Sequence, residues 1–184
     1  MKGGLKIESI EYGWFKMRIG RDWIEVSDYL DYDFPKELLR KVWNVLLEDG
    51  KEEWLYLMDE PRAEIMQISN DNGKIHLAAY DLSKECFDLS NKEEDEKDNC
   101  GKCSFRYDWS LEDIVDELVS EFYLYENGNG RALYETHWAK FPVDEYEKLK
   151  NLAFELDRKQ SKFHKLYCVD TMYPERLALP VELP

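Results

Sequence analysis

The sequence predicts an α+β domain, in which an antiparallel sheet of about five strands carries helices packed on one face. Short apolar segments follow one another with only brief turns between them, which favours antiparallel pairing. Three longer segments each carry a single apolar stripe at helical spacing, and such stripes must be buried against one side of a sheet. The expected order of elements is ββ-α-βββ-α-(β)-α.

The first two strands lie close to the N-terminus. Residues 7–19 have the pattern of one strand, whose apolar positions include Tyr12 and Trp14. The apolar phase changes by one residue around Gly13, as a β-bulge would make it. A second strand is expected at residues 23–28, after a short turn.

A helix and three strands follow. Pro35 opens the helix, at a position where its missing N–H group costs nothing, and Gly50 lies just past the end. The strands are expected at residues 54–58, 63–69 and 75–80. Between the last two, the run Asn70-Asp71-Asn72-Gly73 is a strong signal for a tight hairpin turn.

An acidic loop at about residues 81–104 separates these strands from the next helix. Ser110 is suited to cap that helix, which is expected over residues 111–125. The glycines of the segment 127–130 then stop it. This glycine segment is not expected to bind phosphate, because it follows a helix instead of preceding one.

The C-terminal part is expected to contain one more strand and one more helix. Residues 131–138 are assigned to the strand, and Pro142 starts the helix. These elements complete a single domain of residues 1–159. Residues 160–184, which contain only short apolar pieces and three prolines, are expected to form a docked C-terminal extension.

Negative charge is concentrated in one part of the chain. The protein has 40 acidic and 25 basic residues, a formal net charge of −15. Residues 81–127 hold 15 acidic and 5 basic residues, so this quarter of the sequence carries two thirds of the charge. A field this uneven favours a basic partner and disfavours nucleic acid and anionic membranes. No apolar run could span a membrane, and no apolar signal core precedes the first strand, so we expect a cytoplasmic protein.

The run Cys100-Gly101-Lys102-Cys103 is the one motif that could bind a metal. Two thiolates three residues apart can hold one Zn²⁺, and a glycine helps the tight turn between them. A tetrahedral site needs two more ligands, for which Cys86, Cys168 and the histidines are candidates. Three interpretations stay open: part of a zinc site, a redox dithiol, and two thiols without a function. No other cofactor is indicated.

The helix expected at residues 111–125 has one apolar and one acidic face. Carboxylates at i,i+3 and i,i+4 spacing repel each other by roughly 0.2–0.5 kcal/mol per pair, and no lysine separates them. Either this face is solvated, or it meets a cationic partner. The predicted partner-binding residues are the acids of this face, a neighbouring tyrosine and the acidic run of the preceding loop: Glu112, Asp113, Asp116, Glu117, Glu121, Tyr123, Glu93, Glu94, Asp95 and Glu96.

Groups for catalysis are few. Glu135 and His137 lie two residues apart, so they would share one face of the strand expected there and could act as an acid/base pair. A histidine with a structural role is the more common explanation when no nucleophile motif accompanies it. We therefore expect no catalytic residues, and an enzyme of unrecognised type is kept as an alternative.

The chain resembles the small acidic immunity proteins that accompany bacterial polymorphic toxins. The resemblance is one of pattern: the strand ending Trp23-Ile24-Glu25-Val26, the helix from Pro35 to Leu47, the strands through Tyr80 and the acidic block 81–127. It implies a compact α+β domain without catalytic residues that binds and blocks a basic toxin domain. We therefore expect a non-catalytic acidic binding protein of inhibitor type, with a zinc-binding module as a further alternative.

Overall fold

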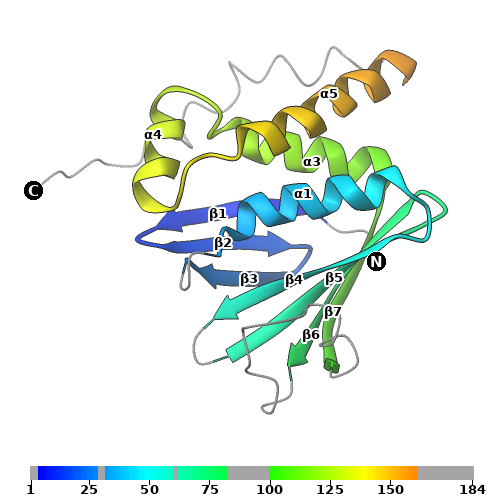
Figure 1. The fold of residues 1–184 in the computed structure, drawn as a ribbon, viewed down its shortest axis with the longest axis horizontal. Coiled ribbons are helices and arrows are strands. Elements are labelled where there is room, and N and C mark those ends of the chain that lie inside the picture. The colour runs from blue at the N-terminus through cyan, green and yellow to red at the C-terminus, as the bar shows by residue number, and fades with distance from the viewer. Residues whose placement is uncertain (1–3, 29–31, 60–61, 83–99, 161–184) are drawn as a thin grey trace, which may run out of the picture.

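The computed structural model describes residues 4–28, 32–59, 62–82 and 100–160. Within them the chain forms two antiparallel sheets, of three and four strands, and four helices, so the predicted α+β class is confirmed. The expectation of one sheet of about five strands is wrong, because the strands divide between two sheets. Figure 1 shows helices α1, α3 and α5 together above the sheets. No helix in the described ranges is both long enough and apolar enough to cross a membrane.

The small sheet contains β1 (Leu5–Glu11), β2 (Trp14–Ile19) and β3 (Asp22–Ser27), in that order. The segment predicted as one strand with a bulge is therefore a hairpin. Tyr12 and Gly13 form its two-residue turn, with φ angles of 49° and 79°. The change of apolar phase at Gly13 marks this turn, and the irregularity in strand pairing lies earlier, at Glu8.

The large sheet contains four strands in sequence order: β4 (Glu52–Asp59), β5 (Arg62–Asp71), β6 (Lys74–Leu82) and β7 (Cys100–Ser110). The three predicted central strands and the hairpin turn before Lys74 are confirmed. The first residues of β7, 100–104, fall within the range predicted as the acidic loop. The rest of that loop, residues 83–99, lies outside the described residues.

Three of the four described helices were predicted: α1 (Phe34–Leu47), α3 (Leu111–Tyr123) and α5 (Val143–Gln160). Each of the first two begins with a side-chain cap, Asp33 for α1 and Ser110 for α3, as their sequences favour. The predicted C-terminal extension begins at the end of α5, and residues 161–184 lie outside the described residues.

Helix α4 (Gly128–His137) corrects the prediction of a strand at residues 131–138. Gly130, Tyr134 and Trp138 are buried, and their spacing of four residues is that of a helix face. The glycine segment therefore opens a helix, and α3 has already ended at Tyr123. A side chain at Gly130 would lie 1.9 Å from the carbonyl oxygen of Leu124, so this close backbone crossing requires glycine.

One hydrophobic core joins both sheets to the helices. The turn between β2 and β3 reaches the large sheet, where Gly20 lies directly against the ring of Tyr107. The Tyr107 hydroxyl donates to Asp22 Oδ2 at 2.7 Å and accepts from the backbone N–H of Arg21 at 3.0 Å. This contact ties the two sheets together at one end of the small sheet.

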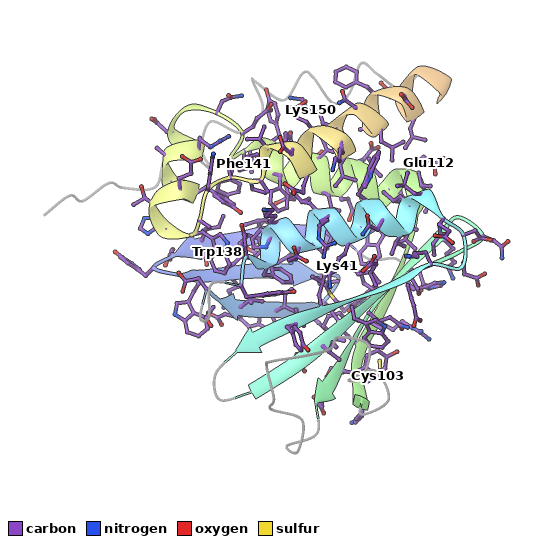
Figure 2. The ribbon with its side chains drawn as sticks, in the orientation of Figure 1. Lys41, Cys103, Glu112, Trp138, Phe141 and Lys150 are labelled. Carbon is purple, nitrogen blue, oxygen red and sulfur yellow. The ribbon has the colours of Figure 1, made fainter. Side chains whose placement is uncertain are left out.

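Helix α1 buries a lysine against the large sheet. Lys41, labelled in Figure 2, is fully buried. Its ammonium group donates to the carbonyl oxygen of Trp54 on β4. The apolar stripe of α1 did not indicate this position, because lysines in amphipathic helices usually face solvent. The aliphatic part of the Lys41 side chain adds to the apolar contact between α1 and the large sheet. The hydrogen bond to the Trp54 carbonyl offsets part of the cost of burying the ammonium group.

Candidate functional site

The acidic face of α3 is not a uniform solvent-exposed stripe. Glu112, Asp113, Asp116, Glu117 and Glu121 are all only partly exposed. Glu117 Oε2 accepts hydrogen bonds from the backbone N–H of Leu5 and from Trp109 Nε1, both at 2.8 Å. Glu121 Oε2 accepts from the backbone N–H of Ile7 at 2.9 Å. Two of the predicted partner-binding acids therefore hold the edge of the small sheet.

The geometry of this contact follows from helix and strand dimensions. Residues four apart on a helix advance about 6 Å, and residues two apart on a strand advance about 6.6 Å. Glu117 and Glu121 thus match the spacing of the outward N–H groups of Leu5 and Ile7. These carboxylates satisfy donors that an edge strand would otherwise present to another chain.

The remaining predicted acids of α3 lie toward its N-terminal end, where Figure 2 labels Glu112. The backbone N–H of Asp113 donates to the Ser110 hydroxyl at 3.1 Å, which fixes the first turn of the helix. Tyr123, at the other end of α3, is partly exposed. The acidic loop residues Glu93, Glu94, Asp95 and Glu96 lie outside the described residues.

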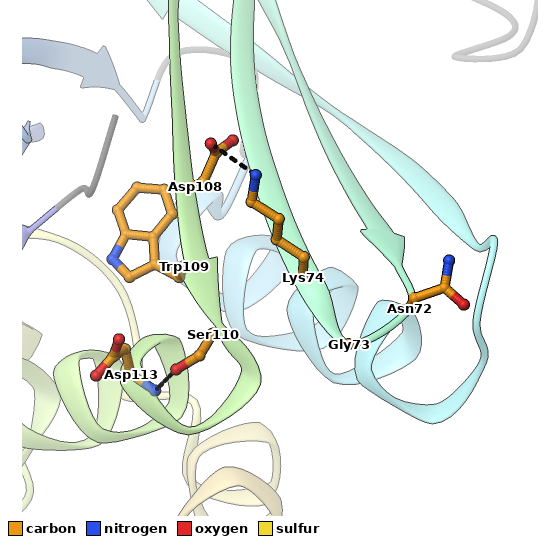
Figure 3. Close-up of a pocket in the computed structure, with 7 residues that line it drawn as sticks. All are labelled: Asn72, Gly73, Lys74, Asp108, Trp109, Ser110 and Asp113. Atoms are coloured by element: carbon orange, nitrogen blue, oxygen red, sulfur yellow. Dashed lines mark hydrogen bonds and ion pairs between the residues drawn. The ribbon is translucent and has the colours of Figure 1, made fainter.

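A shallow pocket of about 410 Å³ lies at the start of α3 (Figure 3). It is lined by Asn72, Gly73, Lys74, Asp108, Trp109, Ser110 and Asp113. Asp49 accepts from the backbone N–H of Asn72 at 2.5 Å, so the loop after α1 joins this region. Together Asp49, Asp71, Asp108, Glu112 and Asp113 form what we call the acidic end.

Asp108 of the acidic end is held by two neighbouring side chains. Its Oδ1 lies 2.6 Å from His76 Nδ1, and its Oδ2 lies 3.0 Å from the Lys74 ammonium. Burial alone would raise the pKa of the Asp108 carboxyl, but the hydrogen bonds from His76 and Lys74 outweigh it and lower the pKa to about 2. Asp108 is therefore an ionised part of the link between β6 and β7.

The cysteine pair lies on β7, where the backbone is extended and not folded into the tight knuckle that zinc requires. Cys103 is exposed, and its thiol donates to the carbonyl oxygen of Phe105 at 3.2 Å. Among the described residues, no three His, Cys, Asp or Glu side chains are grouped to hold a metal ion. Cys86, Cys168 and the side chain of Cys100 lie outside the described part, so the zinc interpretation stays a prediction.

Glu135 and His137 do not form the acid/base pair considered from the sequence. They lie on helix α4, where a separation of two residues turns the side chains about 200° apart. Glu135 pairs with Arg131 at 2.6 Å, and that hydrogen bond lowers the pKa of its carboxyl. His137 Nδ1 instead accepts from the backbone N–H of Tyr12 at 3.3 Å.

The exposed aromatic residues of the small sheet are not evident from the sequence pattern. Tyr12, Trp14 and Trp23 are 85%, 36% and 65% exposed. Tyr12 and Trp14 had been counted with the apolar positions of a continuous strand. Once residues 12 and 13 are recognised as a turn, strict alternation places Phe15 in the core and Trp14 on the outer face.

The sequence matches no protein-family model and no curated protein, and the fold matches no solved structure.

Proposed function

We propose that the protein is a non-catalytic acidic binding protein, which binds a basic protein partner and blocks its activity. The observation that carries the proposal is the acidic end, where Asp108 and Asp113 line the pocket at the start of α3 and Asp49, Asp71 and Glu112 lie on the segments beside it. It adds to a chain whose net charge is −15. The resemblance to immunity proteins suggests that the partner is a toxin domain.

The acidic end suits a partner with a basic surface for two physical reasons. Carboxylates gathered on one side attract cations over distances of about a Debye length, which raises the rate of encounter. The pocket offers a concave surface in which a lysine or arginine side chain can contact carboxylates and apolar atoms at once. Glu117 supports this surface indirectly, because its carboxylate accepts from the indole N–H of Trp109, which lines the pocket.

The test compares two charge-reversal variants of equal net charge. One combines Asp71→Lys with Glu112→Lys at the acidic end, and the other combines Asp144→Lys with Glu155→Lys on helix α5. The partner is first captured from the native cell at low salt on the immobilised protein, and its association rate is then measured by stopped flow. We expect the acidic-end variant to associate about ten-fold more slowly and with weaker salt dependence.

The α5 variant controls for total charge, because it changes the net charge by the same amount at different positions. It should retain most of the wild-type association rate. Equal decreases of the association rate in both variants would show that only total charge matters. An unchanged salt dependence in the acidic-end variant would show that this surface is not part of the interface. Reversal at Glu117 is avoided, since it would disturb the edge of the small sheet.

A further inference from the structure

The outer face of the small sheet carries three exposed aromatic residues, two of them at one hairpin. Tyr12 forms the tip of the β1–β2 hairpin, Trp14 follows it on β2, and Trp23 lies on β3. In Figure 1 this hairpin lies beside α4, at the end of the molecule opposite to the start of α3. It is therefore a surface distinct from the acidic end.

Fold stability does not explain the tyrosine at this turn. Two tight hairpins, one in each sheet, have nearly the same backbone: φ is 49° and 79° at Tyr12–Gly13, and 53° and 79° at Asn72–Gly73. Asparagine tolerates the left-handed conformation, whereas tyrosine is disfavoured there. Because Tyr12 is 85% exposed, burial contributes little to offset this strain. Strain of this kind is common at functional sites.

Helix α4 holds the strained turn in place. The backbone N–H of Tyr12 donates to His137 Nδ1 at 3.3 Å, and the N–H of Gly13 donates to the carbonyl oxygen of His137 at 2.7 Å. The Tyr12 and His137 rings meet edge to face, with centroids 5.1 Å apart. A side chain presented in one fixed position loses less entropy when it binds.

The charges around the rings favour a cation. Glu11, Glu25 and Asp28 are exposed, and the Asp28 carboxylate lies against the turn at Gly13. The Lys16 ammonium lies 3.8 Å from the ring centroid of Trp23 and 3.7 Å from Glu25 Oε2. This face thus already holds one cation between an aromatic ring and a carboxylate, which is a favourable environment for ammonium and guanidinium groups.

We infer that the surface of Tyr12 and Trp14, flanked by Glu11 and Asp28, binds arginine or lysine side chains of the basic protein partner. The inference rests on the proposed function for the class of partner, and it adds a second contact surface to that function. The rings supply short-range contact energy, and the carboxylates select cationic side chains over neutral ones.

The test uses the full chain and a defined probe, an acetylated eight-residue peptide of alternating glycine and arginine. Binding is followed by chemical-shift changes of the Tyr12 and Trp14 backbone amides and the Trp14 indole N–H at about 150 mM salt, where exposed charges are largely screened beyond 8 Å. We expect shifts at the hairpin, and a dissociation constant at least ten-fold higher after Trp14→Ala or Tyr12→Asn. Tyr12→Asn gives the turn the residue that the second hairpin uses, so it should fold normally.

Two comparisons make the outcome decisive. A peptide with citrulline in place of arginine keeps the shape and loses the charge, and it should bind at least ten-fold more weakly. The acidic-end variant, Asp71→Lys with Glu112→Lys, should leave the hairpin shifts unchanged even if the proposed function fails at that surface. Equal binding by both peptides, wild-type affinity in the Tyr12 and Trp14 variants, or shifts confined to the start of α3 would each overturn the inference.

Discussion

The small and the large sheet each contain a two-residue hairpin of the same conformation, and they differ in what supports them. In the large sheet, Asn70 ties its hairpin to neighbouring backbone: its amide donates to the carbonyl of Val45 and accepts from Gly73 N–H. In the small sheet, the hairpin at Tyr12 is held by His137, more than 120 residues away. These hydrogen bonds at the hairpin of the large sheet span 3 and 25 residues, and the one at the hairpin of the small sheet spans 125.

The two sheets also protect their outer edges differently. The edge of β1 is covered by Glu117 and Glu121 of α3. The edge strand β7 instead carries exposed Lys102 and Arg106, and its pairing with β6 is interrupted near Cys103. Charged side chains and irregular pairing both discourage the addition of another strand. The small sheet thus depends on a helix for its integrity, and variants that break its long-range contacts should be the most damaging.

The largest effect is expected where the two sheets meet. In Gly20→Ala the new methyl group would lie 2.3 Å from the Tyr107 ring, at a φ of 62° that disfavours side chains. We expect the free energy of unfolding to fall by about 3 kcal/mol or more, because overpacking and left-handed strain act together. Gly73→Ala is the matched control, because its φ is 79° and its methyl group would meet nothing within 4 Å. Its free energy of unfolding, measured in urea, should fall by only about 1–2 kcal/mol. Similar losses in the Gly20 and Gly73 variants would show that the contact with Tyr107 adds nothing to the strain.

The next effect concerns the edge of β1. Glu117→Ala leaves the backbone N–H of Leu5 and the indole N–H of Trp109 without this acceptor, and we expect a loss of about 2–3 kcal/mol. Amide hydrogen exchange at Leu5 should accelerate more than exchange on β5. Glu155→Ala, at an exposed position of α5, should change stability by less than about 0.5 kcal/mol. Unchanged exchange at Leu5 would show that the carboxylate does not protect the edge.

The smallest effect is a pH dependence within the large sheet. The pKa of Asp108 in the folded protein, about 2, lies below its ordinary value of 3.8, so ionisation stabilises the fold above that value. This contribution should disappear as the pH falls from about 4 to 2. Because the side chain is 24% exposed, screening by solvent reduces it to about 1 kcal/mol.

Asp108→Asn isolates this contribution, because it removes the titrating group and keeps a similar shape. Urea midpoints of the wild type and the variant should differ at pH 5 and converge as the pH approaches 2. Parallel pH profiles would mean that the His76–Asp108 contact does not couple to folding.

Much of the fold was determined by short stretches of sequence. Pro35 and Ser110 marked the starts of two helices, and Asn72–Gly73 marked the hairpin of the large sheet, because caps and turns need only a few neighbouring residues. The same locality explains the two main errors. Tyr12 is not a typical turn residue, so the change of apolar phase at Gly13 also fitted a bulge, and α4 has no side-chain cap to mark its start.

Only the tertiary structure decided which charged and aromatic side chains are available to a partner. The sequence established a strongly acidic chain and an acidic, amphipathic helix. Net charge is a sum over residues, and an amphipathic helix follows from the spacing of apolar residues, so neither requires knowledge of distant contacts. The sequence could not show that Glu117 and Glu121 bind strand N–H groups more than 110 residues away, or that Lys41 is buried. The exposure of the Tyr12 hairpin likewise depends on where helix α4 packs, and long-range packing of this kind leaves no periodic trace in the sequence.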